Sequence, residues 1–211
     1  MSHLAAKAKT RDSGQYIRQS MIFAMFLAAG MMFGIAGIAE DFVPLFLGEE
    51  YEKCVLLIRV MAPTVPFIAW ANVIRTQYLI PNHEDKSYII SVVLGAAVNL
   101  VVNLSLIPAF GAFGAIVGTV CAEGAVCISQ TIMVRKKIEV VRYLRDTVFY
   151  FFFGAVMFLV IRVLHCMIND TVIAICIEIL VGGGIYVVMS GLYTYQRNRE
   201  MLKSIIKKRK M

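Results

Sequence analysis

The sequence predicts an all-α, polytopic integral membrane protein, and three observations lead to this fold class. Hydrophobic residues make up 59% of the 211 residues, whereas soluble domains average roughly 45–50% even when glycine is counted. The mean hydropathy is +0.74. The apolar residues are gathered into runs of about 20 residues, the length that a helix needs to cross a bilayer. Strands would alternate in polarity and these runs do not, so we expect helices.

Six such runs divide the chain into three parts. We expect a cytoplasmic N-terminal segment over 1–19, a six-helix transmembrane bundle over 20–193 and a basic cytoplasmic tail over 194–211. The expected spans are about 20–39, 55–79, 87–107, 112–133, 147–166 and 171–193. Between the first two spans, "EDFVPLFLGEEYEK" (40–53) carries apolar residues framed by acidic ones. We expect this segment to lie along the outer membrane surface.

Basic residues indicate the orientation of the spans. The formal net charge is +7, and Lys and Arg gather near the N-terminus, around 135–145 and after 197. Lys53 is the only Lys or Arg in the three connections expected on the outside. The positive-inside rule therefore places both termini in the cytoplasm. In a membrane protein, basic clusters of this kind indicate contact with anionic membrane lipids, and we expect no nucleic-acid partner.

The second span contains polar and helix-breaking residues. Pro63 and Pro66 each remove a backbone donor, so we expect the helix to bend or loosen there. The bend is either a hinge in a moving helix or a feature of interhelical contact alone. Arg75 and Gln77, near the cytoplasmic end, are candidates to line a cavity, although Arg75 could also extend to the lipid headgroups.

The third span has Asn99 and Asn103 on one face, one turn and two turns after Gly95. This face forms either part of a hydrated wall or a set of hydrogen bonds between helices. In the fourth span, Gly114 and Gly118 form a GxxxG pair that favours close helix contact.

Thr119 and Glu123 share a face of the fourth span, and Glu123 lies close to the bilayer centre. A carboxylate at that depth costs about 2.5–3.5 kcal/mol on insertion scales, so such residues face a bundle interior or a cavity. We expect Glu123 either to couple an ion in a polar cavity or to form a structural pair.

The last two spans contain Arg162 and Glu178, which we expect to meet as a structural salt bridge. We expect His165 to be solvated at the outer interface. The five cysteines fit no ligand spacing, and we interpret them as small buried hydrophobic residues. Because no nucleotide loop, zinc motif or nucleophile elbow is present, we expect no enzyme, no cofactor and no metal site.

The order of the motifs resembles the polysaccharide-biosynthesis flippases of the multidrug/oligosaccharidyl-lipid/polysaccharide exporter superfamily. The resemblance covers about 1–193. Its most specific parts are "QYLIP" (77–81), "VNLVVNLSLIPAFGAFGA" (98–115) and "GTVCAE" (118–123), with "PLFLGEEY" (44–51) as a second mark. Such flippases have about fourteen spans in two lobes around a central cavity, and this chain matches the last six. The chain would then be a fragment or a truncated reading frame that lacks the N-terminal lobe.

The resemblance implies part of an exporter in a bacterial inner membrane. Its substrate would be a polyprenyl-pyrophosphate-linked oligosaccharide, flipped outward by alternating access and driven by an ion gradient. The cavity candidates in this chain are Arg75, Gln77, Asn99, Asn103, Thr119 and Glu123. The alternatives are a drug or small-cation extruder lobe of the same superfamily, and an inactive truncated membrane fragment.

Overall fold

The computed structural model describes residues 2–168 and 171–209, with side chains described over 14–168 and 172–197. Within these ranges the chain is helical and contains no strand. The α-helices are α1 (Ser2–Phe46), α2 (Lys53–Met61), α3 (Thr64–Ile74), α4 (Asp85–Phe110), α5 (Ala112–Val134), α6 (Val140–Met167) and α7 (Thr171–Arg209). A short 3-10 helix covers Glu49–Tyr51, and a π-helical turn covers Arg75–Leu79.

The helices provide six stretches that are long and apolar enough to cross a membrane, which confirms the predicted fold class. The stretches extend beyond the predicted spans at most ends, because hydropathy marks only the apolar middle of a helix whose backbone hydrogen bonds continue further. They are Gly14–Phe46, Lys53–Leu79, Asp85–Phe110, Ala112–Val134, Val140–Met167 and Val172–Arg197.

The segment 40–53 is not the separate surface segment that the sequence suggested. Helix α1 continues through it to Phe46 and ends before Gly48, whose φ of +100° favours glycine. Val43 is fully buried and packs with Ala39 and Val55, and Asp41 is buried too. The acidic residues misled the prediction because their partners lie on helices that are distant in sequence.

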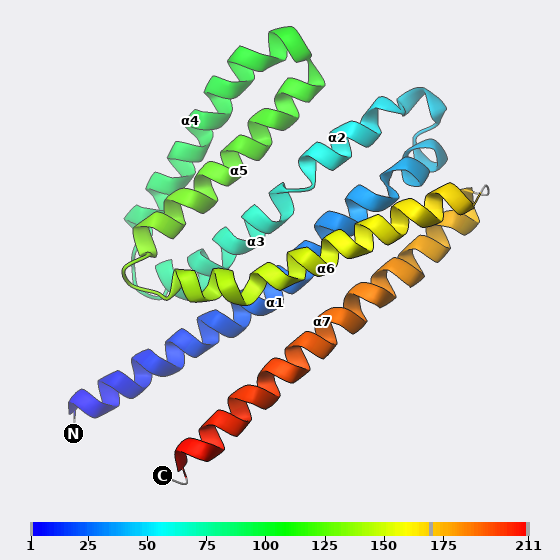
Figure 1. Cartoon of the computed structure of the whole chain (residues 1–211). Helices are drawn as coiled ribbons and strands as arrows, with labels where there is room; N and C mark the ends of the chain where they lie inside the picture. Colours follow the sequence, from blue (N-terminus) through cyan, green and yellow to red (C-terminus); the bar gives the residue numbers. More distant parts are fainter. Residues whose placement is uncertain (1, 169–170, 210–211) are drawn as a thin grey trace.

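Three long helices, α1, α6 and α7, lie side by side, and α3 connects them to the α4–α5 hairpin (Figure 1). The start of α1 and the end of α7 lie at the same end of the bundle. The turns before α4 and after α5 are joined by an ion pair of 2.5 Å from Lys137 Nζ to Glu84 Oε1. This hydrogen bond raises the pKa of Lys137.

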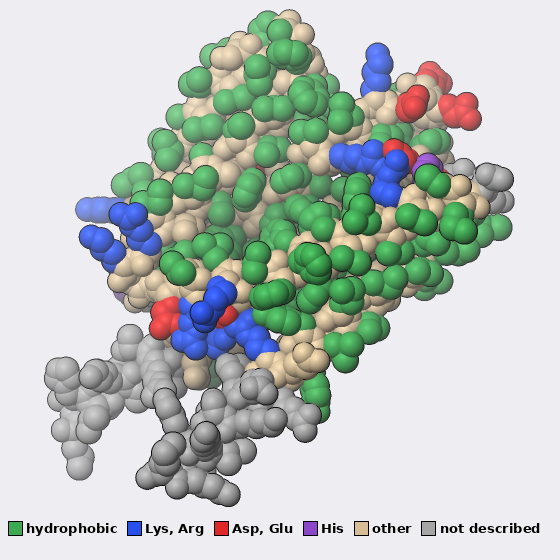
Figure 2. Space-filling view, viewed as in Figure 1, with side chains coloured by type: hydrophobic (Ala, Val, Ile, Leu, Met, Phe, Trp, Pro, Cys, Tyr) green, Lys and Arg blue, Asp and Glu red, His purple; other side chains and the backbone are tan. Residues whose placement is uncertain are grey.

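Apolar side chains are spread over the whole visible face of the bundle, whereas charged side chains gather at its ends (Figure 2). Helix α4 is the most exposed span: within it only Ser91 and Gly95 are buried. A helix that is apolar on nearly all sides and exposed in the monomer needs lipid or another protein around it. This surface agrees with a polytopic membrane protein.

Small residues bring α4 and α5 together. A Cβ added to Gly114 would lie 2.6 Å from the carbonyl of Leu106, and one added to Gly95 would lie 2.4 Å from Val126. Since lipid tails are as apolar as leucine, helices in membranes associate through such close approach rather than through a hydrophobic effect.

A buried carboxylate holds α1, α6 and α7 together. Asp146 of α6 is 2% exposed, and its Oδ2 atom accepts a 2.6 Å hydrogen bond from Arg18 Nε of α1. Arg197 of α7 forms an ion pair with Oδ1 and donates a 3.1 Å hydrogen bond to the Asp146 carbonyl. One carboxylate therefore joins three helices at the end of the bundle that holds the termini.

Replacing Gly114 by alanine should lower the stability of the hairpin by about 1–3 kcal/mol, because the new methyl group meets backbone that cannot move aside. The matched control is Gly183→Ala, where nothing lies within 4 Å of the added Cβ. That change should be neutral or stabilising by up to about 1 kcal/mol, the helix-propensity difference. Thermal unfolding in detergent, followed by circular dichroism, measures both. Equal effects would contradict the close-approach argument.

Replacing Asp146 by asparagine should destabilise the protein by about 3 kcal/mol, since it leaves two guanidinium groups without their carboxylate. Glu139→Gln serves as the control, because its ion pair with Arg142 is half-exposed and should contribute at most about 0.5 kcal/mol. The same unfolding experiment compares the two variants. A stable Asp146→Asn protein would show that the clamp is dispensable.

Candidate functional site

The second span is broken where the sequence placed its two prolines. Helix α2 ends at Met61 and α3 begins at Thr64, whose hydroxyl donates a 2.8 Å hydrogen bond to the Met61 carbonyl. Pro63 caps α3, and Pro66 occupies its first turn. Amides in a first turn have no partner within the helix, so Pro66 costs no hydrogen bond there.

The same span loses regular α-helical geometry a second time at its other end. Over Arg75–Leu79 the backbone forms a π-helical turn, in which the Ile80 amide donates a 3.0 Å hydrogen bond to the Arg75 carbonyl. The Arg75 guanidinium is 5.5 Å from the Tyr88 ring centroid and donates a 3.3 Å hydrogen bond to its hydroxyl. Gln77 is exposed.

The asparagine face of α4 lies against α5. Asn103 Nδ2 donates a 2.9 Å hydrogen bond to Asn99 Oδ1, along the helix. A Cβ on Gly118 would lie 2.0 Å from Asn103 Oδ1, so a larger residue at this position would displace the amide. The Oδ1 atom is buried and has no hydrogen-bond partner among the described residues.

Thr119 and Glu123 occupy a half-buried strip of α5. The Thr119 hydroxyl is satisfied by the Ala115 carbonyl at 3.1 Å. Glu123 has no ion pair among the side chains that the structure describes. One face of α5 contacts α3, where Trp70 Nε1 donates a 2.9 Å hydrogen bond to Thr131. The Glu123 carboxylate is therefore held by no neighbour in this part of the chain.

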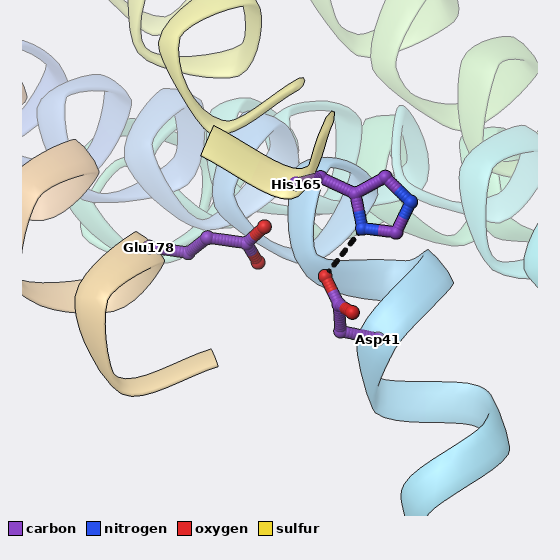
Figure 3. Close-up of side chains that lie close together, drawn as sticks. All are labelled: Asp41, His165 and Glu178. Atoms are coloured by element: carbon purple, nitrogen blue, oxygen red, sulfur yellow. Dashed lines mark hydrogen bonds and ion pairs between the residues drawn. The ribbon is translucent and has the colours of Figure 1, made fainter. Parts of the chain in front are cut away.

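Sequence reasoning missed a second polar site, at the end of the bundle opposite the termini. Asp41 of α1, His165 of α6 and Glu178 of α7 point toward one another (Figure 3). Each offers one ligand atom, and these atoms all lie within 4.8 Å of one another. His165 Nδ1 lies 2.7 Å from Asp41 Oδ2. We call these three residues the DHE cluster.

Three further charged side chains surround the DHE cluster. Glu40 Oε2 lies 3.2 Å from His165 Nε2, so the imidazole is held between two carboxylates. Glu40 also forms ion pairs with Arg162 and with Arg59, the latter at 2.9 Å. Arg59 in turn donates a 3.0 Å hydrogen bond to the Ala36 carbonyl.

Glu178 is the most enclosed member of the DHE cluster. It is 0% exposed, and neither carboxylate oxygen has a hydrogen-bond partner among the described residues. The sequence predicted a salt bridge between Glu178 and Arg162, but in the structure Arg162 forms its ion pair with Glu40. Burial of an unpartnered carboxylate is costly, so this arrangement needs a compensating positive charge or proton.

Two expectations about individual side chains were wrong. His165 is not simply solvated, because Asp41 and Glu40 hold both ring nitrogens. Of the five cysteines, Cys121, Cys166 and Cys176 are exposed rather than buried. The sequence held one signal for the DHE cluster: three titratable residues interrupt apolar runs near span ends. Their convergence was invisible because Asp41 and His165 lie 124 residues apart.

Comparison with known proteins adds no further identification. No family model, no curated protein and no solved structure matches this chain.

Proposed function

We propose that this chain forms part of a membrane transporter that moves a lipid-linked oligosaccharide across a bacterial inner membrane by alternating access. In this proposal both termini face the cytoplasm, and a second lobe completes the cavity. The chain supplies the positions that bind the substrate or couple an ion. The proposal rests on one structural observation for the transport class and on two supports for the substrate class.

The two breaks in the second span are the observation that supports a transport function. Membrane helices lose regular geometry only where protein or water satisfies the freed backbone groups, and transporters place such discontinuities beside their sites. Here the breaks at Ala62–Pro63 and at Arg75–Leu79 frame α3. They allow α3 to change its direction against α1 and α5, which it contacts.

Glu123 supports ion coupling in this proposal. A carboxylate near the middle of a span, half-buried and without an ion pair in the described part of the chain, is able to exchange a cation or a proton. A carboxylate locked in a salt bridge would be unable to do so. Thr119, one turn away, adds a hydroxyl to the same strip.

A basic hollow between α5 and α6 supports the proposal that the substrate has an anionic lipid headgroup. The hollow measures about 770 Å³ and is lined by Arg135, Arg142 and Arg145. Arg142 pairs with Glu139, whereas Arg135 and Arg145 have no ion pair among the described side chains. Guanidinium groups bind phosphate oxygens in bidentate fashion. Figure 2 shows basic side chains gathered at this end of the bundle. The resemblance to polysaccharide-biosynthesis flippases is the second support.

A binding measurement tests the substrate class. The chain has a single tryptophan, Trp70 of α3, which contacts Thr131 of α5 at the hollow and reports on this region through its fluorescence. A polyprenyl-pyrophosphate-linked disaccharide should change the emission in a saturable way. Replacing Arg135 and Arg145 together by glutamine should weaken binding at least about tenfold, the loss of one to two charge-assisted hydrogen bonds.

The control variant is Lys53→Gln, which removes a basic residue at the opposite end of the bundle. Its affinity should equal that of the unaltered chain. Saturable binding of a lipophilic cation such as tetraphenylphosphonium, without binding of the pyrophosphate lipid, would favour the drug or small-cation extruder instead. Binding of neither probe would reject a transport site in this region.

Replacing Glu123 by glutamine tests ion coupling. In vesicles that contain the transporting assembly, flipping of the lipid-linked sugar should depend on the ion gradient for the unaltered protein. The dependence should disappear in Glu123→Gln, because the amide cannot exchange an ion. Glu50→Gln, an exposed position near the start of α2, should retain it. Unchanged flipping by Glu123→Gln at every gradient would eliminate the coupling role.

A further inference from the structure

We propose that the DHE cluster is a binding site for a divalent cation of the zinc class. The ligands are a carboxylate oxygen of Asp41, the imidazole Nδ1 of His165 and a carboxylate oxygen of Glu178. The site joins α1, α6 and α7 at the end of the bundle opposite the termini. It lies apart from the breaks of the second span and from Glu123, so it is independent of the proposed transport function.

The donor set fits this class of metal. Imidazole nitrogen with two carboxylate oxygens is a common three-ligand set for zinc, which leaves a fourth position for water. With metal–ligand bonds of about 2.0–2.2 Å, tetrahedral ligand atoms lie about 3.3–3.6 Å apart. Nδ1 and the Asp41 oxygen are now 2.7 Å apart, and all three ligand atoms lie within 4.8 Å. Binding a metal requires Nδ1 and the Asp41 oxygen to move apart by less than about 1 Å.

The unpartnered carboxylate is the observation that points to a ligand. Glu178 is fully buried, it is directed toward the other two residues, and both of its oxygens lack a hydrogen-bond partner among the described residues. A buried charge is normally paired or bound to a metal. Asp41, which is 6% exposed, adds a second buried carboxylate beside it. Two adjacent buried carboxylates repel each other unless a cation or a proton lies between them.

The residues around the cluster would hold His165 in the orientation that a metal ligand needs. A histidine that binds a metal donates its other ring N–H to a carboxylate, which fixes the tautomer and the ring orientation. His165 Nε2 lies 3.2 Å from Glu40 Oε2. Glu40 is fixed in turn by Arg59 and Arg162. Nδ1 lies 2.7 Å from Asp41 Oδ2 and faces Asp41 and Glu178; a bound cation would replace the proton that Nδ1 shares with Asp41, so that Nδ1 becomes the lone-pair donor.

The charge balance agrees with a bound cation. Counting Glu40, Asp41 and Glu178 against Arg59 and Arg162, the site has three negative and two positive formal charges when His165 is neutral. Both arginines form their ion pairs with Glu40, which lies outside the DHE cluster. With His165 neutral, neither arginine is paired with the two buried carboxylates of the DHE cluster.

Cobalt binding to the full chain in detergent tests the proposal, with Co²⁺ as a spectroscopic substitute for Zn²⁺. The metal-stripped protein should take up one Co²⁺ with visible d–d bands, without a thiolate charge-transfer band, and Zn²⁺ should displace it. Glu178→Gln should weaken binding at least tenfold while helicity and elution volume stay unchanged. Glu40→Gln, which alters only the support of His165, should weaken it about 10–100-fold.

His83→Gln is the matched control, since His83 lies in the turn before α4 at the other end of the bundle and should leave Co²⁺ affinity unchanged. Should Glu178→Gln fail to fold, Asp41→Asn and His165→Gln provide the same comparison. The proposal is overturned if the unaltered chain takes up no Co²⁺. It is equally overturned if Glu178→Gln binds Co²⁺ as tightly as the unaltered chain, or if the spectrum shows cysteine ligation. Failure here would leave the proposed transport function untouched, because no transport residue belongs to the cluster.

Discussion

The clamp of Arg18 and Arg197 on the buried Asp146 carboxylate is the constraint on which the long-helix group depends. Helices within lipid gain nothing from burying apolar surface against each other, so directional polar contacts and close approach must define their neighbours. Asp146 of α6 forms ion pairs with Arg18 of α1 and with Arg197 of α7. Because the carboxylate is almost fully enclosed, moving either helix away would remove one of the two guanidinium groups that compensate its charge.

The same three helices are held a second time at the opposite end, with the balance of charge reversed. There α6 contributes cationic and imidazole groups through Arg162 and His165, and the carboxylates come from α1 and α7. Between the two polar ends the contacts are aromatic: Tyr186 stacks on Phe26 at 5.5 Å and donates a 2.6 Å hydrogen bond to its carbonyl. Polar ends and an aromatic middle fix the register of α1, α6 and α7.

The α4–α5 hairpin is assembled by a different principle. Its helices meet through glycines and through a buried 3.0 Å hydrogen bond that Gln130 Nε2 donates to Ser91 Oγ, and no ion pair between α4 and α5 occurs among the described residues. It joins the long helices through α3, a segment that is irregular at both ends. The fold therefore combines a group of helices locked by charges with a hairpin attached through a deformable span. In the proposed alternating-access mechanism, the two parts would move relative to each other at this division.

By itself, the sequence determined the all-α membrane fold, since a run of about 20 apolar residues can satisfy its backbone in lipid only as a helix. It also located the break at Pro63, because proline acts through its own ring. The tertiary structure alone decided which charges meet. Arg162 pairs with Glu40 on α1, and Glu178 faces Asp41 and His165. Helical periodicity places a residue on a face and at a depth, but not against a partner. The partners of Asp41 and Glu178 come from helices far apart in the chain, and only the assembled bundle brings them together.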